Sequence, residues 1–367
     1  MRLVMAMKVR DEGDVLDENL RYHRAQGVDG FIVTDNGSTD STPEILRRWE
    51  SEGLLKLIEE PSTEEFRDQA HWWVTRMARL AATELAADWV VHADADEFWS
   101  PVSGTLKEAL ERIPDEYGVV LAPRPEFPAR PDTDGPFWER MTVREARSRL
   151  RPKIAHRAIP DAVLHRGAHD VDLERDESGA RHSGRAVMRA VKPTLEVTED
   201  KLVWAPMWPA RVLHFPLRSF EQYKRKVEVT LAGGFDDKAH ADLRLAYEGG
   251  RLPDLYAKLA VDDASVEEGL REGRLVEDRT VAEYLGNPEA RPARDRSAPG
   301  REAEEADRVT LDAMETLART QRSLIRQLDN FRSRLAKQRR RATQAQGARK
   351  GRLRTRAARA LRQRREP

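Results

Sequence analysis

The sequence contains no cysteine. A disulfide framework, a thiolate metal site and a cysteine nucleophile are therefore excluded together. The sequence also has no apolar run near the roughly 20 residues that cross a bilayer. No secretory signal precedes the charged residues that follow Met7. These absences predict a soluble cytoplasmic protein.

An excess of charge of either sign is absent as well, because 64 basic residues balance 64 acidic ones among 367. The balance is not uniform along the chain. Residues 331–367 hold 15 Lys or Arg and one acid, a net charge of +14, so the other 330 residues carry −14. This charge difference predicts that the basic tail is organised separately from the acidic body of the chain. The positive charge of the tail indicates an anionic partner for it.

Apolar strand-like stretches alternate with helical patterns in the first hundred residues. The stretches are Leu3–Val9, 31–33, 54–58 and 89–91. This alternation predicts an α/β fold with a mostly parallel sheet and helices on both faces. Ligands of such sheets bind beyond the carboxyl ends of the strands, where Asp35 and Asp94 are expected.

The composition predicts four segments. Residues 1–285 form one domain, with a nucleotide-binding part at about 1–100 and an acceptor part at about 101–285. Residues 286–308 are rich in Pro, charge and small residues and read as a linker. Residues 309–337 and 338–367 are expected to be a coiled coil and a basic tail.

The coiled-coil prediction depends on apolar spacings that alternate between four and three residues over about three and a half heptads. The seam positions are Thr310, Met314, Leu317, Gln321, Leu324, Leu328, Phe331 and Leu335. A coiled coil predicts a homo-oligomer, and a lone amphipathic helix is the alternative. The tail is interpreted as solvated and partly helical, with peripheral binding to an anionic membrane as the alternative. Nucleic acid is not the favoured partner.

The segment "HADADEFW" places three acids within four positions directly after an apolar strand. Residues two apart in an extended chain face the same side, so Asp94 and Asp96 can bind one ligand. Mn²⁺ or Mg²⁺ prefers such oxygen donors, and Glu97 is expected to support the turn from behind. A solvated surface turn is the alternative. The position after a buried strand, with Phe98 and Trp99 as anchors, favours the metal site.

Three segments in order carry a family resemblance: "KVRDEGDVLDENLRYHRAQGVDGFIVTDNGSTDSTPEIL", "DQAHWWVTRMARLA" and "DWVVHADADEFW". They resemble a family 2-type glycosyltransferase with the GT-A fold, of the branch in which Asp-Glu-Phe-Trp follows the metal motif. The resemblance is dense over residues 1–100 and sparser to about 235. It implies transfer of a sugar from a nucleoside diphosphate sugar to an acceptor hydroxyl, with a glycan or lipid-linked acceptor.

The resemblance also implies roles for single residues. The donor-binding set is Asp35, Asp40, Gln69, Arg76, Asp94, Arg218 and Lys226, and the metal set is Asp94, Asp96 and His214. Imidazole suits a third metal ligand, and Lys or Arg suits a diphosphate. A strand-end histidine beside a basic helix face is the alternative for His214. Arg10-Asp11-Glu12 departs from the family pattern, so the role of the first loop stays open.

The acceptor side is less defined. His165 and His169 are expected to shape it, with buried structural histidines as the alternative. An inverting enzyme needs a carboxylate base, for which Glu139 and Asp170 are the candidates. Two other functions remain open. A sugar nucleotidyltransferase is disfavoured because "KVRDEGD" stands where a Gly-rich phosphate loop is expected, and an inactive coiled-coil adaptor because the aspartates are intact.

Overall fold

The computed structural model describes residues 1–60, 66–101, 104–113, 118–146, 148, 150–165, 168–175, 181–182, 210–232 and 238–287. For residues 66–71, 170, 174–175, 181–182, 232 and 238–240 the description covers the backbone only. The chain divides into two compact units, Met1–Leu311 and Asp312–Pro367, and every described residue belongs to the first. The predicted coiled coil and basic tail therefore lie outside the described residues, as does the linker beyond residue 287.

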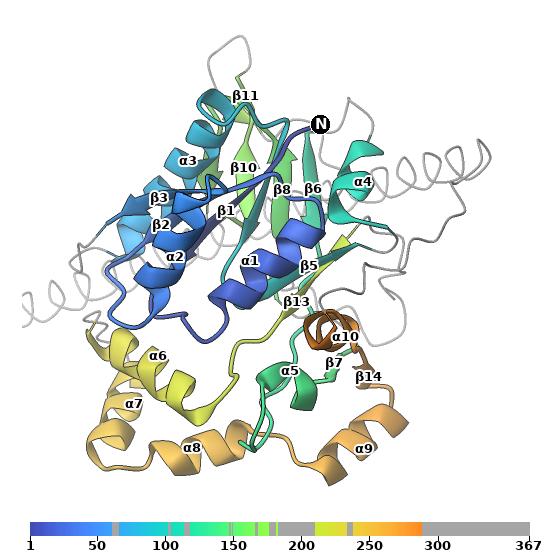
Figure 1. Ribbon diagram of the computed structural model, residues 1–367. Coiled ribbons are helices and arrows are strands. Elements are labelled where there is room, and N and C mark those ends of the chain that lie inside the picture. Colours follow the sequence, from blue (N-terminus) through green and yellow to red (C-terminus); the bar gives the residue numbers. More distant parts are fainter. Residues whose placement is uncertain are drawn as a thin grey trace, which may run out of the picture. The chain divides into compact units, whose positions relative to one another are not determined.

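A six-stranded sheet forms the centre of the first unit, in the order β3-β2-β1-β4-β8-β6 (Figure 1). Its strands are β1 (Leu3–Val9), β2 (Gly30–Asp35), β3 (Leu55–Glu59), β4 (Trp89–Ala93), β6 (Val119–Ala122) and β8 (Lys153–Arg157). The first four run parallel, and β8 is antiparallel to both β4 and β6. The predicted α/β class with a mostly parallel sheet is confirmed.

The strands are apolar because both faces of the sheet are covered. All five residues of β4 are buried, although successive side chains point to opposite faces. The connecting helices are α1 (Leu16–Ala25), α2 (Thr42–Ser51) and α3 (Phe66–Thr83). Helix α2 begins with Pro43 in its first turn and ends before Gly53, whose φ of 72° suits only glycine without strain.

A second ladder joins the metal-motif segment to a distant part of the chain. Strand β5 (Glu97–Pro101) pairs antiparallel with β13 (Ala210–His214), which places His214 opposite Glu97. Phe98 and Trp99 of β5 are fully buried, and each such side chain stabilises the fold by about 1.5–3 kcal/mol. The sequence correctly predicted that these aromatic residues anchor the acidic turn.

Seven further helices and three two-stranded ladders complete the described part of the first unit. The helices are α4 (Leu106–Glu111), α5 (Phe137–Arg140), α6 (Phe220–Ala232), α7 (Lys238–Glu248), α8 (Leu252–Leu259), α9 (Asp263–Arg271) and α10 (Thr280–Gly286). Strand β7 (Val143–Glu145) pairs with β14 (Leu275–Glu277), β9 (Val163–His165) with β10 (Asp170–Asp172), and β11 (Glu174–Arg175) with β12 (Arg181–His182). Helices α6 and α8 pack around a small apolar cluster that includes Tyr223 and Tyr256. None of the described helices combines the length and the apolar character needed to cross a membrane.

Candidate functional site

The carboxyl ends of the four parallel strands meet at one edge of the sheet. Val9 at the end of β1 pairs with Asp35 at the end of β2, which in turn pairs with Glu59 of β3. Met7 of β1 pairs with Ala93, the last residue of β4. The loops that follow these strands are therefore neighbours, and this is the edge at which ligands of α/β sheets bind.

Two aspartates organise the loop after β2. The Asp35 carboxylate accepts hydrogen bonds from the backbone N–H and the hydroxyl of Ser38, at 3.2 and 2.5 Å, and burial raises its pKa. The Asp40 carboxylate accepts the N–H groups of Gly13 and Thr42, both at 2.9 Å. A Cβ on Gly13 would approach Asp40 to 3.0 Å, so glycine permits the close contact between the first two loops. Donor binding by either aspartate stays a prediction.

Asp94 stands directly after β4 and is held by a buried lysine. Lys153, at the start of β8, is 2% exposed and donates to the Asp94 carboxylate at 2.7 Å. The same ammonium lies 3.0 Å from Glu97, whose other carboxylate oxygen pairs with Arg124. Glu97 also accepts the Asp94 backbone N–H at 2.9 Å. Glu97 thus fixes the turn from within, as the sequence predicted, and two cations balance its charge.

These contacts keep both partners charged. Burial works to raise the pKa of Asp94, but Lys153 outweighs it and lowers that pKa to about 2. Burial works to lower the pKa of Lys153, and Asp94 and Glu97 together raise it above its ordinary value. At neutral pH the pair is therefore an ion pair and not a neutral hydrogen-bonded pair.

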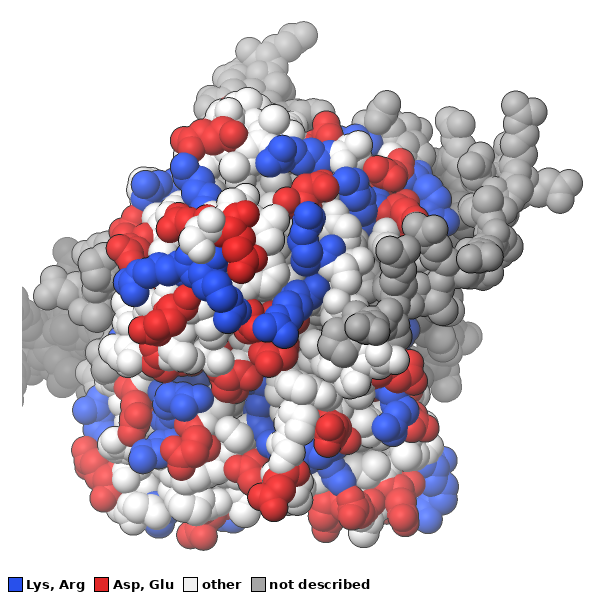
Figure 2. All heavy atoms as spheres, in the orientation of Figure 1, with Lys and Arg blue, Asp and Glu red and all other residues white. Residues whose placement is uncertain are grey.

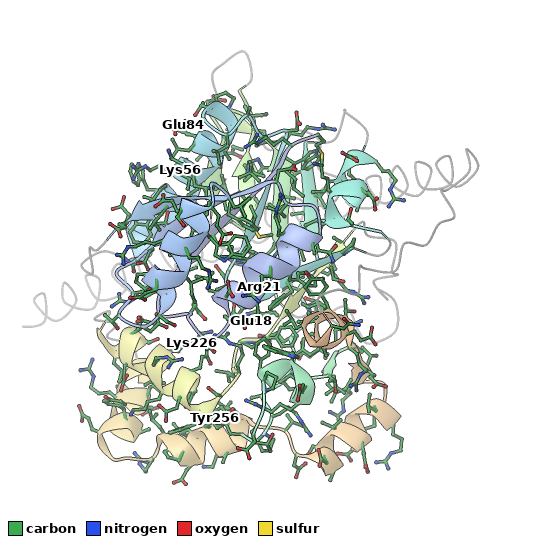
Figure 3. All side chains as sticks on the ribbon, in the orientation of Figure 1. Glu18, Arg21, Lys56, Glu84, Lys226 and Tyr256 are labelled. Atoms are coloured by element: carbon green, nitrogen blue, oxygen red, sulfur yellow. The ribbon has the colours of Figure 1, made fainter. Side chains whose placement is uncertain are left out.

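Asp96 is buried, and three cationic or imidazole groups surround it. Lys226, which Figure 3 labels on α6, donates to its Oδ2 at 2.8 Å. Arg218 lies 3.7 Å from the same oxygen. His214 Nε2 lies 3.7 Å from Oδ1. Burial opposes ionisation of Asp96, but Lys226, His214 and Arg218 prevail and hold its pKa far below the ordinary value. Asp96 is therefore a carboxylate at any physiological pH.

Arg218 links this cluster to the first loop. Its guanidinium is 1% exposed, donates to Glu12 at 2.6 Å and makes two bonds to Asp14 at 2.9 and 3.0 Å. Burial raises the pKa of Glu12 to about 7, against the attraction of Arg218. The first loop, whose role the sequence left open, thus supplies carboxylates that hold the buried arginine.

Acidic and basic side chains are interspersed over the face of the molecule that Figure 2 shows.

No three His, Cys, Asp or Glu side chains in the described part of the chain are gathered closely enough to hold a metal ion, but the donor types at this edge are ones that divalent cations prefer. The Nε2 of His214 lies 3.7 Å from the Oδ1 of Asp96, and Lys226 pairs with the Oδ2. Each carboxylate oxygen of Asp96 therefore has an imidazole or a cation nearby. Asp94 lies two residues before Asp96, at the start of the same turn. Two carboxylates and an imidazole suit Mn²⁺ or Mg²⁺.

The two donor-binding residues predicted on α3 have different outcomes. Arg76 donates to Glu60 at 2.7 Å, and its guanidinium lies 5.2 Å from the centre of the exposed Trp72 ring. Glu60 follows β3, and its backbone N–H donates to the Asp35 carbonyl, so Arg76 approaches the binding edge through Glu60. Gln69 lies in α3, but its side chain is outside the described residues.

Of the acceptor-side candidates, His165, His169 and Asp170 lie in or next to the ladder of β9 and β10, whereas Glu139 lies on α5. His165 Nε2 lies 2.9 Å from Asp172, and His169 Nδ1 lies 2.7 Å from the Pro152 carbonyl oxygen, next to Lys153. Burial, reinforced by Lys153, lowers the pKa of His169 to about 4. Of the candidate bases, Glu139 is exposed on α5, and the side chain of Asp170 lies outside the described residues. Their roles stay predictions.

Sequence reasoning missed the cations and carboxylates that surround the two motif aspartates. They are Glu12, Asp14, Arg124, Glu126 and Lys153. Lys153 gave one signal, because a charged residue that opens the apolar run "KIA" has to pair inside the fold. Glu12 belongs to the first loop, whose role the sequence left open, and the other three lie in segments with no distinguishing pattern.

Comparison with known proteins supports the resemblance. Residues 11–173 match the model of glycosyltransferase family 92, a span that includes both motif aspartates and Lys153. The prediction of a glycosyltransferase is confirmed. The sequence motifs resemble a family 2-type enzyme, whereas the model that matches is that of family 92. A search among curated proteins gave no match.

Solved structures give a weaker likeness. The crystal structure of S. aureus TarS 1–349 in complex with UDP is 14% identical, covers 78% of this chain and 92% of that chain, and has a TM-score of 0.32. Glucosyl-3-phosphoglycerate synthase from Mycobacterium tuberculosis, in complex with Mn²⁺, UDP and phosphoglyceric acid, is 20% identical over 34% of this chain and 43% of that chain, with a TM-score of 0.24.

Proposed function

We propose that the protein transfers a sugar from a nucleoside diphosphate sugar to an acceptor hydroxyl, with a divalent cation at Asp94, Asp96 and His214. The observation that carries the proposal is the convergence of His214 Nε2 and Asp96 Oδ1 at 3.7 Å, at the carboxyl edge of the sheet. A cation bound there stabilises negative charge on the departing diphosphate. The match to glycosyltransferase family 92 supports the reaction class.

The chain's own cations supply the remaining charge stabilisation. In the transfer, the bond between the anomeric carbon and the diphosphate oxygen breaks and leaves its electron pair on the diphosphate. The acceptor oxygen bonds to the anomeric carbon and gives its proton to a base, for which Glu139 and Asp170 are the candidates. Lys226 and Arg218 lie beside Asp96, and we expect them to attract the developing negative charge.

The first loop argues against a nucleotidyltransferase. Such an enzyme needs backbone N–H groups and cations after β1 to hold a triphosphate. Here Glu12 and Asp14 present carboxylates at that place, and both are paired with Arg218. We infer further that the acceptor is a glycan or lipid-linked sugar in cell-surface assembly, as the resemblance implies. The basic tail at 338–367 would then contact an anionic membrane surface.

The proposal is tested by nucleotide release from UDP-, GDP- and TDP-sugars in the presence of Mn²⁺. Asp96→Asn keeps the size of the side chain but removes its charge, so we expect turnover to fall by at least about 100-fold with an unchanged circular dichroism spectrum. The exposed Glu84→Gln variant is the matched control, because Glu84 forms an exposed ion pair with Lys56 on the outside of the fold. Unchanged turnover in Asp96→Asn would remove the metal-site proposal.

A further inference from the structure

His214 is held between two carboxylates, one on each ring nitrogen. Its Nε2 lies 3.7 Å from Asp96, and its Nδ1 lies 3.2 Å from Oε1 of Glu126. The imidazole is about nine-tenths buried, with 12% of its side chain exposed. The Nδ1 contact falls short of an aligned hydrogen bond, so a small ring rotation is needed to complete it.

Backbone pairing on both sides fixes Glu126 beside His214. The Phe127 N–H donates to the His214 carbonyl at 2.8 Å, and the His214 N–H lies 3.2 Å from the Pro125 carbonyl. The Glu126 carbonyl accepts the Glu145 N–H at 2.8 Å. Glu126 is therefore anchored through its backbone, and only its side chain has to adjust.

The two carboxylates make different demands on the ring. If the Glu126 carboxylate accepts a hydrogen bond from Nδ1–H, the ring proton stays on Nδ1 and the lone pair is on Nε2. That lone pair and Oδ1 of Asp96 are then both electron-pair donors directed at the same space. Two facing donors repel unless a cation lies between them. Histidine ligands of metals are commonly held by a carboxylate on the second nitrogen, which fixes the tautomer and makes the ring more basic.

We propose that Glu126 is the positioning residue of the cation site: it holds His214 in the tautomer with the proton on Nδ1, so that Nε2 is free to bind the cation with Asp96. This inference rests on the proposed function and adds a residue that neither the metal motif nor the family resemblance predicts. Glu126 contacts neither cation nor substrate. It acts only through His214.

The test is Mn²⁺ binding by the full chain in the presence of UDP, followed by the electron paramagnetic resonance signal of free Mn²⁺. We expect Glu126→Ala to weaken binding by about 10–100-fold. Glu126→Gln, which keeps an oxygen acceptor for Nδ1–H, should lose less. The exposed Glu84→Ala variant is the control and should bind as the unmodified protein does. Thermal melting of each variant reports whether it is folded.

A double variant separates positioning from a general electrostatic effect. If Glu126 acts through His214, Glu126→Ala should cost no further affinity in a His214→Ala background. Additive losses, or normal Mn²⁺ affinity in both Glu126 variants while His214→Ala is impaired, would overturn the inference alone. No Mn²⁺ binding by the unmodified protein would overturn the inference together with the metal part of the proposed function.

Discussion

Lys226 competes with a cation for the Asp96 carboxylate. We therefore expect its removal to strengthen Mn²⁺ binding and to weaken binding of the donor diphosphate. Its ammonium lies 2.8 Å from Asp96 Oδ2 and 2.9 Å from the Pro216 carbonyl oxygen. Lys226→Met keeps most of the aliphatic stem but removes the charge. Asp96 would then offer a less neutralised carboxylate to Mn²⁺, whereas a donor diphosphate would lose one of its cations.

The magnitude follows from the geometry. Two unit charges at 2.8 Å attract by about 6 kcal/mol at an effective dielectric constant of 20. Because 38% of the Lys226 side chain is exposed, solvent screening and the cost of desolvation leave a net of about 1–2 kcal/mol. Mn²⁺ binding without nucleotide should then become about 5–30-fold tighter, since 1.4 kcal/mol corresponds to a factor of ten.

The assay has two arms. Mn²⁺ is titrated against the nucleotide-free protein, and KM for the donor is measured at saturating Mn²⁺. In Lys226→Met the dissociation constant for Mn²⁺ should fall, and KM for the donor should rise. Lys224→Met is the matched control, because Lys224 is exposed on the same helix two residues away. Mn²⁺ binding that is unchanged or weaker in Lys226→Met would refute the competition argument, whatever the effect on KM.

Three other predictions follow from burial, charge and the heptad pattern. Lys153→Met leaves Asp94 and the fully buried Glu97 short of a cation, so the free energy of unfolding in urea should fall by about 3–5 kcal/mol; an unchanged denaturation midpoint would contradict this. Burial lowers the pKa of His23 to about 3 and of His156 to about 4, so their contribution to stability is complete above about pH 6.5 and is lost as the pH falls toward 4. Each histidine costs up to about 1.4 kcal/mol per pH unit in that window, partly offset by Glu12, whose raised pKa acts in the opposite direction; a urea midpoint that is flat from pH 6.5 to 4.5 would refute the effect. Deletion of residues 300–367 should lower the subunit number in light scattering while sugar transfer continues, and an unchanged subunit number would exclude the coiled coil as the oligomer contact.

The order and type of the N-terminal elements could be predicted from local pattern. The apolar run at Leu3–Val9 has the bounds of β1, and the punctuation by Pro43 and Gly53 encloses α2. The acidic turn after β4 and its aromatic anchors were predictable for the same reason. These features depend on residues close together in the sequence, where side-chain alternation, caps and turn residues act directly.

Prediction was weaker where the chain returns to the sheet from far away. The apolar residues 210–215 have a strand-like pattern, but nothing in the sequence identifies β5 as the partner of that strand. A ladder between segments more than a hundred residues apart depends on the path of all the intervening chain. The partners of Arg218 in the first loop were hidden for the same reason.

The sequence by itself determined the α/β class, the edge of the sheet at which ligands bind, and the carboxylates Asp94 and Asp96 that face that edge. Only the tertiary structure decided how those carboxylates are neutralised, by Lys153 for the first and by Lys226 with Arg218 for the second. The physical reason is that burial makes an unpaired charge costly but does not specify which distant cation pairs with it. That choice is made when strands and helices from separate parts of the chain pack together.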